Sequence, residues 1–340
     1  MSTDVNTTSE QQDDTGGAPP TGYRRLLARV GGLGPIAIKF NLLLILLALV
    51  VIGSMLSPAF LTTRNLLNLL QQSSVLGVMA MGMTFVILAK QIDLSVGSMS
   101  AFGGITVAWF MAAGYGVVPS LLLATAGGAL LGMTMGGLSA RLGLPSFIVS
   151  LAGLVSIRGL TFLVSDIPIG GLPASFVWLG GRIGPVPMMG IVFIIVTIVC
   201  GLVLRFTVFG EYVYATGGNE EAARLSGVPT RLIITGVFVI SGSLAAFSGV
   251  LRTAWLTVGQ PQAGEGMELD AIAAVVLGGT SLFGGRGGVF GTFIAVLLLS
   301  VLRNVFNLIG LGSFAQMVAT GIILVAAIVV NTQVLQRSGA

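Results

Sequence analysis

The stretch IKFNLLLILLALVVIGSMLS, residues 38–57, contains a single charged side chain, that of Lys39. A helix needs about 20 mostly apolar residues to cross about 30 Å of hydrocarbon. The stretch therefore has the length and composition of a membrane span. The first 35 residues lack the short positive segment and apolar core of a secretory signal, so we expect this span to remain in the chain.

The whole chain shares the character of this stretch. Of its 340 residues, 54% are hydrophobic and 8% are charged, and the mean hydropathy is +1.00. This leaves too little polar surface to cover a water-soluble domain of such a size. We therefore predict an all-α, polytopic transmembrane helical bundle. Apolar windows predict about ten spans, at 38–57, 66–89, 95–113, 117–139, 146–165, 187–205, 232–251, 271–284, 289–309 and 315–331.

The eighth window is the weakest of the ten. AIAAVVLGGTSLFG, residues 271–284, is short for a crossing and rich in glycine, which is typical of a tilted, broken or re-entrant segment. Eight or nine spans are therefore an alternative. The polar ends give the domain organisation: a disordered tail over 1–35, a transmembrane domain over 36–333 and a short tail over 334–340.

The positive charges predict the orientation, because Lys and Arg in short loops favour the cytoplasmic side. With the N-terminus inside, eleven positive residues fall inside and three fall outside. Both tails are then cytoplasmic. The inside set is Arg24, Arg25, Arg29, Lys39, Lys90, Arg141, Arg205, Arg224, Arg231, Arg286 and Arg337, and the outside set is Arg64, Arg182 and Arg252.

Residue counts exclude several chemistries. With no histidine and one cysteine, the chain has no His-based catalysis, no His metal site and no internal disulfide. A phosphate-binding P-loop needs a lysine after glycine, but Lys39 and Lys90 follow Ile38 and Ala89. We therefore expect no ATPase site, no metal and no cofactor on this chain, and no enzymatic activity.

Glycine is abundant, with 50 residues, and small residues repeat every four positions in two predicted spans. This spacing puts them on one helix face, where backbones in a membrane approach closely. We interpret both repeats as helix-packing faces. They are Gly128, Gly132 and Gly136 in one span and Ser241, Ala245 and Gly249 in another.

The predicted cytoplasmic loop 208–231 concentrates charge in a chain that elsewhere avoids it. Residues 220–226 are mostly helix formers, Asn219 is a suitable N-cap, and Gly227 and Pro229 are helix terminators. A short capped helix here offers a rigid surface for another protein. The alternative is a solvated connector.

Four segments carry a family resemblance. They are QIDLSVGSMSAFGG, PSFIVSLAGLVSIRGLTFLVSD, ATGGNEEAARLSGV and VLGGTSLFGGRGGVFGTFIA, which begin at residues 91, 145, 215 and 276. In this order they resemble segments of ribose, xylose and arabinose permeases, which belong with branched-chain amino-acid permeases in one family of ABC importer subunits. The resemblance covers residues 38–333. Within it, EAARLSG resembles the core of the coupling loop.

The resemblance implies a monosaccharide permease of a bacterial inner membrane, with spans 2–5 and 7–10 as inverted halves. It implies separate ATPase subunits that use ATP and Mg, an external binding protein, a second permease subunit that is identical or a close paralogue, and no nucleic acid. The implied coupling residues are Glu221, Ala222, Ala223, Arg224 and Gly227. Many such permeases continue from the glycine with a longer apolar-proline pattern, whereas here Pro229 follows Val228 at once.

Polar residues within the spans are candidates for the translocation pathway, because buried polar groups in hydrocarbon must face protein or water. Asp93 either lines a polar cavity or caps the helix that follows it, and we expect Arg158 to pair with a buried carbonyl or acid. The Asn and Gln side-chain amides in the spans either bind sugar hydroxyls or join helices by hydrogen bonds, and we favour the second role. The candidates are Asn68, Gln71, Gln72, Asp93, Ser95, Asn304 and Asn307.

Other functions are less consistent with the sequence. An ion-coupled secondary transporter needs acidic ion ligands within the spans, and Asp93 is nearly the only one. A structural membrane protein leaves the charged loop unexplained. Branched-chain amino acids remain the alternative substrate, but we expect no charged pocket, which favours a neutral sugar.

Overall fold

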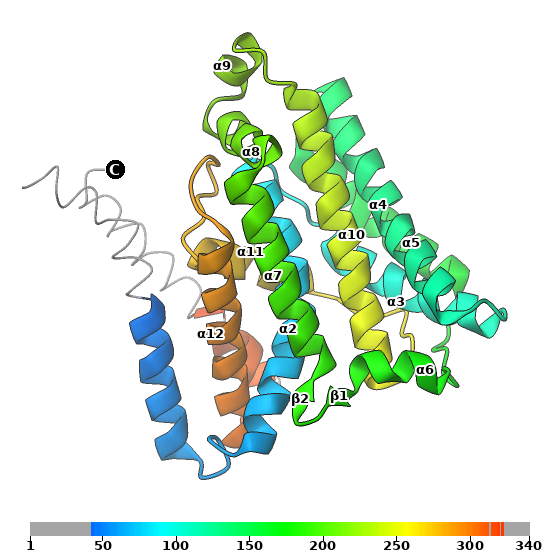
Figure 1. Cartoon of the computed structure of the whole chain (residues 1–340), viewed down its shortest axis with the longest axis vertical. Coiled ribbons are helices and arrows are strands. Elements are labelled where there is room, and N and C mark those ends of the chain that lie inside the picture. The colour runs from blue at the N-terminus through cyan, green and yellow to red at the C-terminus, as the bar shows by residue number, and fades with distance from the viewer. Residues whose placement is uncertain (1–41, 313, 320, 323–340) are drawn as a thin grey trace, which may run out of the picture.

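The computed structural model describes residues 42–312, 314–319 and 321–322. Both predicted tails and most of the predicted span 315–331 lie outside these residues. The described part is a bundle of helices with one two-stranded hairpin, in which Arg182 pairs with Pro187 and Ile183 with Val186 (Figure 1). The prediction of an all-α fold is confirmed.

Element bounds follow the predicted spans closely. A first apolar helix, Leu42–Leu56, precedes the labelled elements. The long helices are α2 (Thr63–Leu88), α4 (Val117–Leu142), α5 (Ser146–Val164), α7 (Met188–Phe206), α10 (Thr230–Leu256) and α12 (Val289–Leu308). The shorter elements are α3 (Val96–Ala112), α6 (Ala174–Val177), η1 (Trp178–Gly180), β1 (Arg182–Ile183), β2 (Val186–Pro187), α8 (Val208–Gly218), α9 (Glu220–Leu225) and α11 (Met267–Leu277).

Six helices in the described part are long and apolar enough to cross a membrane. Two more apolar helices, Leu42–Leu56 and α3, are shorter. The predicted count of about ten spans is therefore not confirmed. The weak window at 271–284 corresponds to the 11-residue helix α11, followed by turns, and is too short to cross alone.

The centre of the bundle is formed by α2 and α10. In α2, 89% of the most apolar window is buried, whereas α4, α5 and α7 expose most of theirs. Exposed leucine, isoleucine and phenylalanine side chains cover these outer helices. A bundle in lipid can expose such side chains without loss of stability, because the surrounding solvent is equally apolar.

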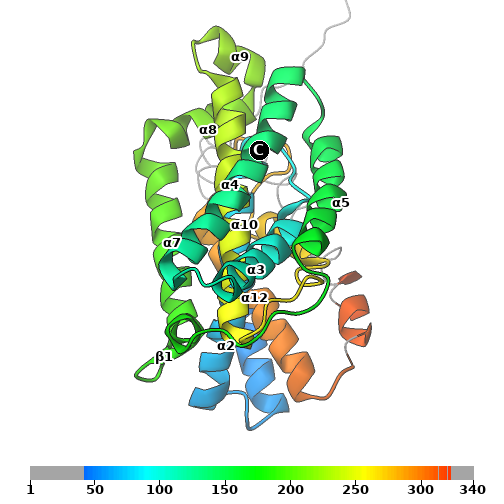
Figure 2. The same ribbon diagram turned by 90° about the vertical axis from the view of Figure 1, so that its right-hand side faces the viewer.

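Small residues line the most extensive helix contact in the described part, between α4 and α10 (Figure 2). Gly128, Gly132 and Gly136 are buried on one face of α4, as predicted, and approach the α10 backbone from Gly242 to Ile234. At Gly136, an added Cβ would lie 2.9 Å from the Cα of Thr235. Glycine is therefore needed at this face for the two backbones to touch.

The pattern of a long helix, a break and a short helix occurs twice. Helix α2 is followed by residues 89–95 and α3, and α10 is followed by residues 257–266 and α11. The two short helices start next to each other, because the Cα of Gly97 lies against Gly264 and Glu268. Paired broken helices of this kind place polar backbone inside membrane transporters.

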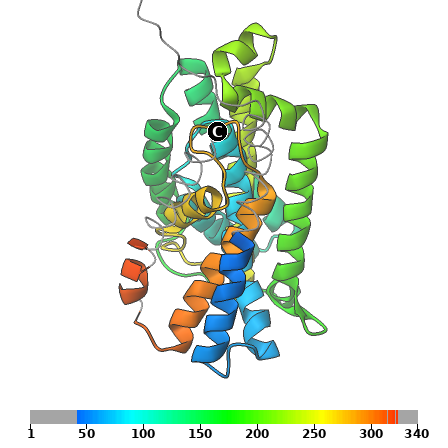
Figure 3. The same cartoon turned by 90° about the vertical axis from the view of Figure 1, so that its left-hand side faces the viewer.

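The two ends of the bundle differ. Helices α8 and α9 project at one end, and α6 and the hairpin lie at the other (Figure 1). The helix Leu42–Leu56 runs beside α12, where Leu42 packs on Ile294 and Leu298 (Figure 3).

Candidate functional site

Helix α9 is a short, capped helix, as the sequence predicts. The Asn219 side-chain oxygen accepts a hydrogen bond from the Ala222 amide at 3.0 Å, and Glu220 and Glu221 occupy the first turn. This arrangement satisfies a free amide and places negative charge at the positive end of the helix dipole. Gly227 ends the segment with φ of 87°, a conformation that disfavours other residues.

The predicted coupling residues present a mixed surface. Ala223 is buried, whereas Glu221, Ala222, Arg224 and Gly227 are exposed. Leu225 adds an apolar group that is 79% exposed. Charged and apolar groups on a rigid turn of helix form a surface that another protein can bind.

A groove of about 380 Å³ lies between α9 and the adjoining ends of α4 and α10. Four of its six lining residues are charged. The lining residues are Ala140, Glu220, Glu221, Arg224, Thr230 and Arg231. The α9 end of the bundle is therefore a polar surface suited to contact with a protein outside the membrane.

Helix α8 was not predicted, because VFGEYVYATGG ends in two glycines and reads as part of a connector. In the structure α8 is held against the loop 278–288 and the end of α2. The Tyr214 hydroxyl donates to the Gly287 carbonyl at 3.0 Å, and the Gly285 amide donates to the Leu88 carbonyl at 2.9 Å. Burial raises the pKa of Tyr214, so its hydroxyl keeps the proton that it donates.

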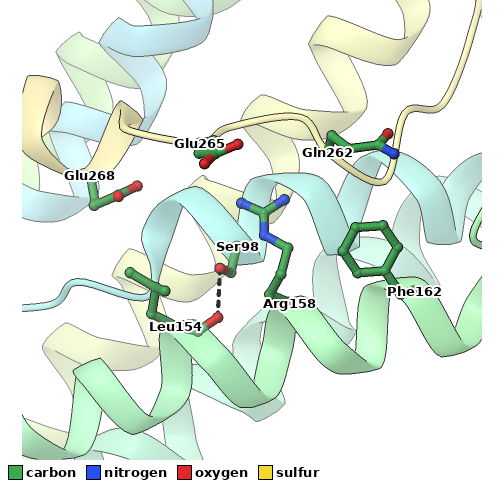
Figure 4. A pocket seen from close by; sticks show the side chains of 7 residues that line it. All are labelled: Ser98, Leu154, Arg158, Phe162, Gln262, Glu265 and Glu268. Carbon is green, nitrogen blue, oxygen red and sulfur yellow. Dashed lines mark hydrogen bonds between the residues drawn. The ribbon is translucent and has the colours of Figure 1, made fainter.

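A polar cavity of about 300 Å³ lies between α5, the first turn of α3 and the segment leading into α11 (Figure 4). It combines one positive, two negative, two neutral polar and two apolar side chains. The lining residues are Ser98, Leu154, Arg158, Phe162, Gln262, Glu265 and Glu268. The expectation that the chain has no charged pocket is therefore wrong.

Arg158 organises this cavity. One of its terminal nitrogens, Nη1, donates to the Pro261 carbonyl at 2.9 Å and to the Ala263 carbonyl at 2.8 Å, which confirms the predicted pairing with a buried carbonyl. These bonds fix the segment before α11 against α5. The guanidinium points toward the part of the chain that carries Glu265, so a positive side chain faces this acidic residue (Figure 4).

Asp93 and Ser95 form a closed, buried network. Asp93 is fully buried and accepts hydrogen bonds from the Ser95 amide at 3.0 Å, the Ser95 hydroxyl at 2.5 Å and the Ser241 hydroxyl at 2.8 Å. The carboxylate thus ties the break before α3 to the middle of α10.

The candidate amides lie apart from the cavity, and most of them join segments. Asn304 exchanges hydrogen bonds with Asn65 of α2 at 2.8 and 2.9 Å, and Gln71 donates to the Gly180 carbonyl at 2.8 Å. Asn68 accepts from Arg182, and Asn307 accepts from Gln316. Gln72 is exposed. None of these side chains lines the polar cavity.

No cluster of three or more His, Cys, Asp or Glu side chains in the described ranges is arranged to hold a metal ion. Cys200 is buried in α7, in agreement with a packing role.

A bundle of apolar helices, two broken helices that meet at a polar cavity and a charged helix at one end define a polytopic membrane transport protein. Residues 65–327 match the family described as the branched-chain amino acid transport system, permease component, and the chain belongs to this family. It is therefore a transport component and not an enzyme.

Its relatives include named sugar permeases. The chain is 41% identical to the ribose import permease of Escherichia coli strain K12, over 86% of this chain and 92% of that protein. It is 41% identical to the ribose import permease of Bacillus subtilis strain 168, over 84% and 90%. It is 36% identical to the D-allose permease of Escherichia coli strain K12, over 86% and 91%. No solved structure matches the chain.

Proposed function

We propose that this chain is the pore-forming permease subunit of a bacterial ABC importer that moves a neutral monosaccharide across the cytoplasmic membrane. Separate ATPase subunits, which use ATP and Mg, dock on α9 and its groove. An external binding protein delivers the sugar to the opposite end. A second permease subunit, identical or a close paralogue, completes the pore.

The capped helix α9 is the observation that carries this proposal. It lies outside the bundle and presents Glu221, Arg224 and the exposed Leu225 around a groove. A partner that moves this rigid helix also moves α8, which is bonded to the loop 278–288.

The proposed orientation places α9 and both termini in the cytoplasm. Arg141 at the end of α4, Arg205 at the end of α7 and Arg231 at the start of α10 all lie at the α9 end of the bundle. Positive charge at the ends of spans favours the cytoplasmic side.

The substrate proposal rests on the relatives named for ribose and D-allose, which match nearly the whole chain. The family description favours a second candidate, a branched-chain amino acid. Measuring the uptake of ribose and of isoleucine distinguishes these two candidate substrate classes.

The experiment is uptake into vesicles that contain the chain, its ATPase and its binding protein. We expect sugar uptake that needs ATP and continues after ionophores collapse the ion gradients. Uptake by this chain alone, or uptake that stops with the gradients, contradicts the proposal.

Charge reversal at the α9 surface tests the docking role. We expect Glu221→Arg to reduce co-purification of the ATPase, whereas Asp166→Arg, an equal reversal at the opposite end of the bundle, leaves it unchanged. Gly227→Pro is expected to lower uptake more than it lowers the amount of folded protein in the membrane. Equal losses of uptake and of folded protein make α9 a structural connector.

A further inference from the structure

The polar cavity cannot face lipid. Arg158 lies twelve residues from the start of α5 at Ser146 and six residues, about 9 Å along the helix, from its end at Val164. Gln262 and Glu265 are exposed beside it. Charged side chains at this depth are costly in hydrocarbon, so they face protein or a water-filled path. This side of α5 therefore borders an aqueous path or another protein subunit rather than the fatty acid chains.

The cavity offers both donors and acceptors to a ligand. Nη1 of Arg158 is occupied by two carbonyls, which leaves Nη2 available. In the described part of the chain, the carboxylates of Glu265 and Glu268 form no ion pair within 4.0 Å and accept no hydrogen bond. Carboxylate oxygens accept hydroxyl protons, and Gln262 adds one donor and one acceptor group.

Charge compensation disfavours an anionic group in this cavity. In broken-helix transporters, a substrate carboxylate binds where half-helix N-termini expose positive dipole ends. Here the Glu268 carboxylate already lies against Gly97 in the first turn of α3. The first turn of α11 holds Glu268 and Asp270 of its own. A carboxylate of this chain, that of Glu268, thus already lies at both helix N-termini, while Asp270 pairs with Arg303.

The remaining features suit a sugar ring. Leu154 and Phe162 lie one turn to either side of Arg158 on α5 and provide apolar surface that faces the segment with Gln262 and Glu265 (Figure 4). A ring with hydroxyl groups on its edge and C–H bonds on its face fits such a mixed lining. The volume of about 300 Å³ lies at the small end of ligand pockets, which suits a monosaccharide.

We propose that the cavity between α5, α3 and α11 is a monosaccharide-binding subsite of the transport pathway, in which Glu265, Glu268, Gln262 and Arg158 bind the hydroxyl groups. This proposal rests on the proposed function, because only a transported solute gives the subsite a role. The fully buried Asp93 and the joined amides then act in helix packing.

The first test measures ribose uptake by the complete transporter in vesicles. A hydrogen bond to a charged group contributes enough free energy for a change of about tenfold, so we expect Glu268→Gln to lower ribose uptake about tenfold. ATP hydrolysis stimulated by the loaded binding protein is expected to persist, which shows that the complex is folded. Asp166→Asn, a change of an exposed carboxylate just after α5, is the control. It lies at the end where the binding protein docks, so uptake is compared per ATP hydrolysed, and this ratio is expected to stay unchanged in Asp166→Asn.

The second test measures occupancy directly. The only cysteine, Cys200, is buried, so Gln262→Cys introduces the one accessible thiol of this chain. We expect ribose to slow labelling of this thiol by a hydrophilic maleimide in the complete transporter, and isoleucine to have no effect. The rate of labelling of an Asp166→Cys control is expected to be the same with ribose, with isoleucine and with neither.

The outcomes separate the two proposals. If the unmodified transporter takes up ribose but Glu268→Gln does so equally well and ribose gives no protection, the subsite is refuted and the proposed function stands. If the unmodified transporter takes up isoleucine and no sugar, the proposed substrate is refuted. Protection by ribose together with the loss of uptake in Glu268→Gln supports both.

Discussion

The neighbouring glycines Gly217 and Gly218 in α8 allow a sharp test of how the α9 end is connected to the bundle. A Cβ at Gly217 would lie 2.7 Å from the Gly285 amide nitrogen and 2.9 Å from the Leu88 carbonyl carbon. A Cβ at Gly218 meets nothing within 4 Å. Substitution to alanine therefore adds the same methyl group at both positions. At Gly217 the methyl group meets backbone atoms, and at Gly218 it meets none.

The two substitutions are expected to change the free energy of unfolding in opposite directions. Ordinary contact begins at 3.4 Å, so Gly217→Ala must displace the Leu88 carbonyl oxygen, which is the nearest backbone atom, as well as the Gly285 amide nitrogen at 2.7 Å. Overpacking of this kind costs about 1–3 kcal/mol, and the gain in helix propensity over glycine is about 1 kcal/mol. Because the overlap is with backbone, the upper end of this cost applies, and we expect Gly217→Ala to destabilise by about 2 kcal/mol net. Gly218→Ala causes no overpacking and has only the gain in helix propensity. This gain is smaller here because Gly218 is the last residue of α8.

The assay compares the apparent melting temperature of the purified chain with the ratio of sugar imported to ATP hydrolysed in vesicles. We expect Gly217→Ala to lower the melting temperature and the transport ratio, because α8 moves away from Leu88 and Gly285. Gly218→Ala is expected to change neither by a measurable amount. Equal results for the two variants refute the inferred close contact.

Three further changes have defined outcomes. Asn219→Ala removes the cap of α9 and is expected to cost about 1 kcal/mol, seen as faster hydrogen exchange of the Ala222 amide with unchanged exchange in the bundle. Asp93→Asn leaves a buried serine hydroxyl without its acceptor and is expected to cost about 1–3 kcal/mol, with uptake falling only in proportion to folded protein; a larger fall in uptake assigns Asp93 to the pathway. Gly132→Ala places a methyl group 2.9 Å from the Phe238 carbonyl carbon and is expected to lower the melting temperature, while Gly137→Ala, where nothing lies within 4 Å, keeps or raises it.

Local patterns were enough to predict the long helices. The predicted span 146–165 corresponds to α5 at Ser146–Val164, and 187–205 corresponds to α7 at Met188–Phe206. Apolar runs bounded by glycine, proline or charge are local signals, and hydrocarbon thickness fixes their length. The cap at Asn219 was predicted for the same reason, because it depends on four consecutive residues.

The polar cavity could not be predicted, because its parts are distant in sequence. Arg158 and Glu265 are more than a hundred residues apart, and no local pattern connects them. The one available signal was an arginine inside a span, which requires a partner there. Helix α8 was missed for a related reason, since its stability depends on contacts with the loop 278–288 and not on its own propensity.

The loop 278–288 contacts α8 on one side and continues directly into α11 on the other. Helix α11 is one rigid rod of 11 residues, about 16 Å long, and its opposite end carries Glu268. A displacement of α8 therefore reaches the cavity through a single element. Thermodynamic coupling between two sites is reciprocal, so any factor by which a protein at α9 changes the affinity of the cavity for a solute is also the factor by which that solute changes the affinity for the protein.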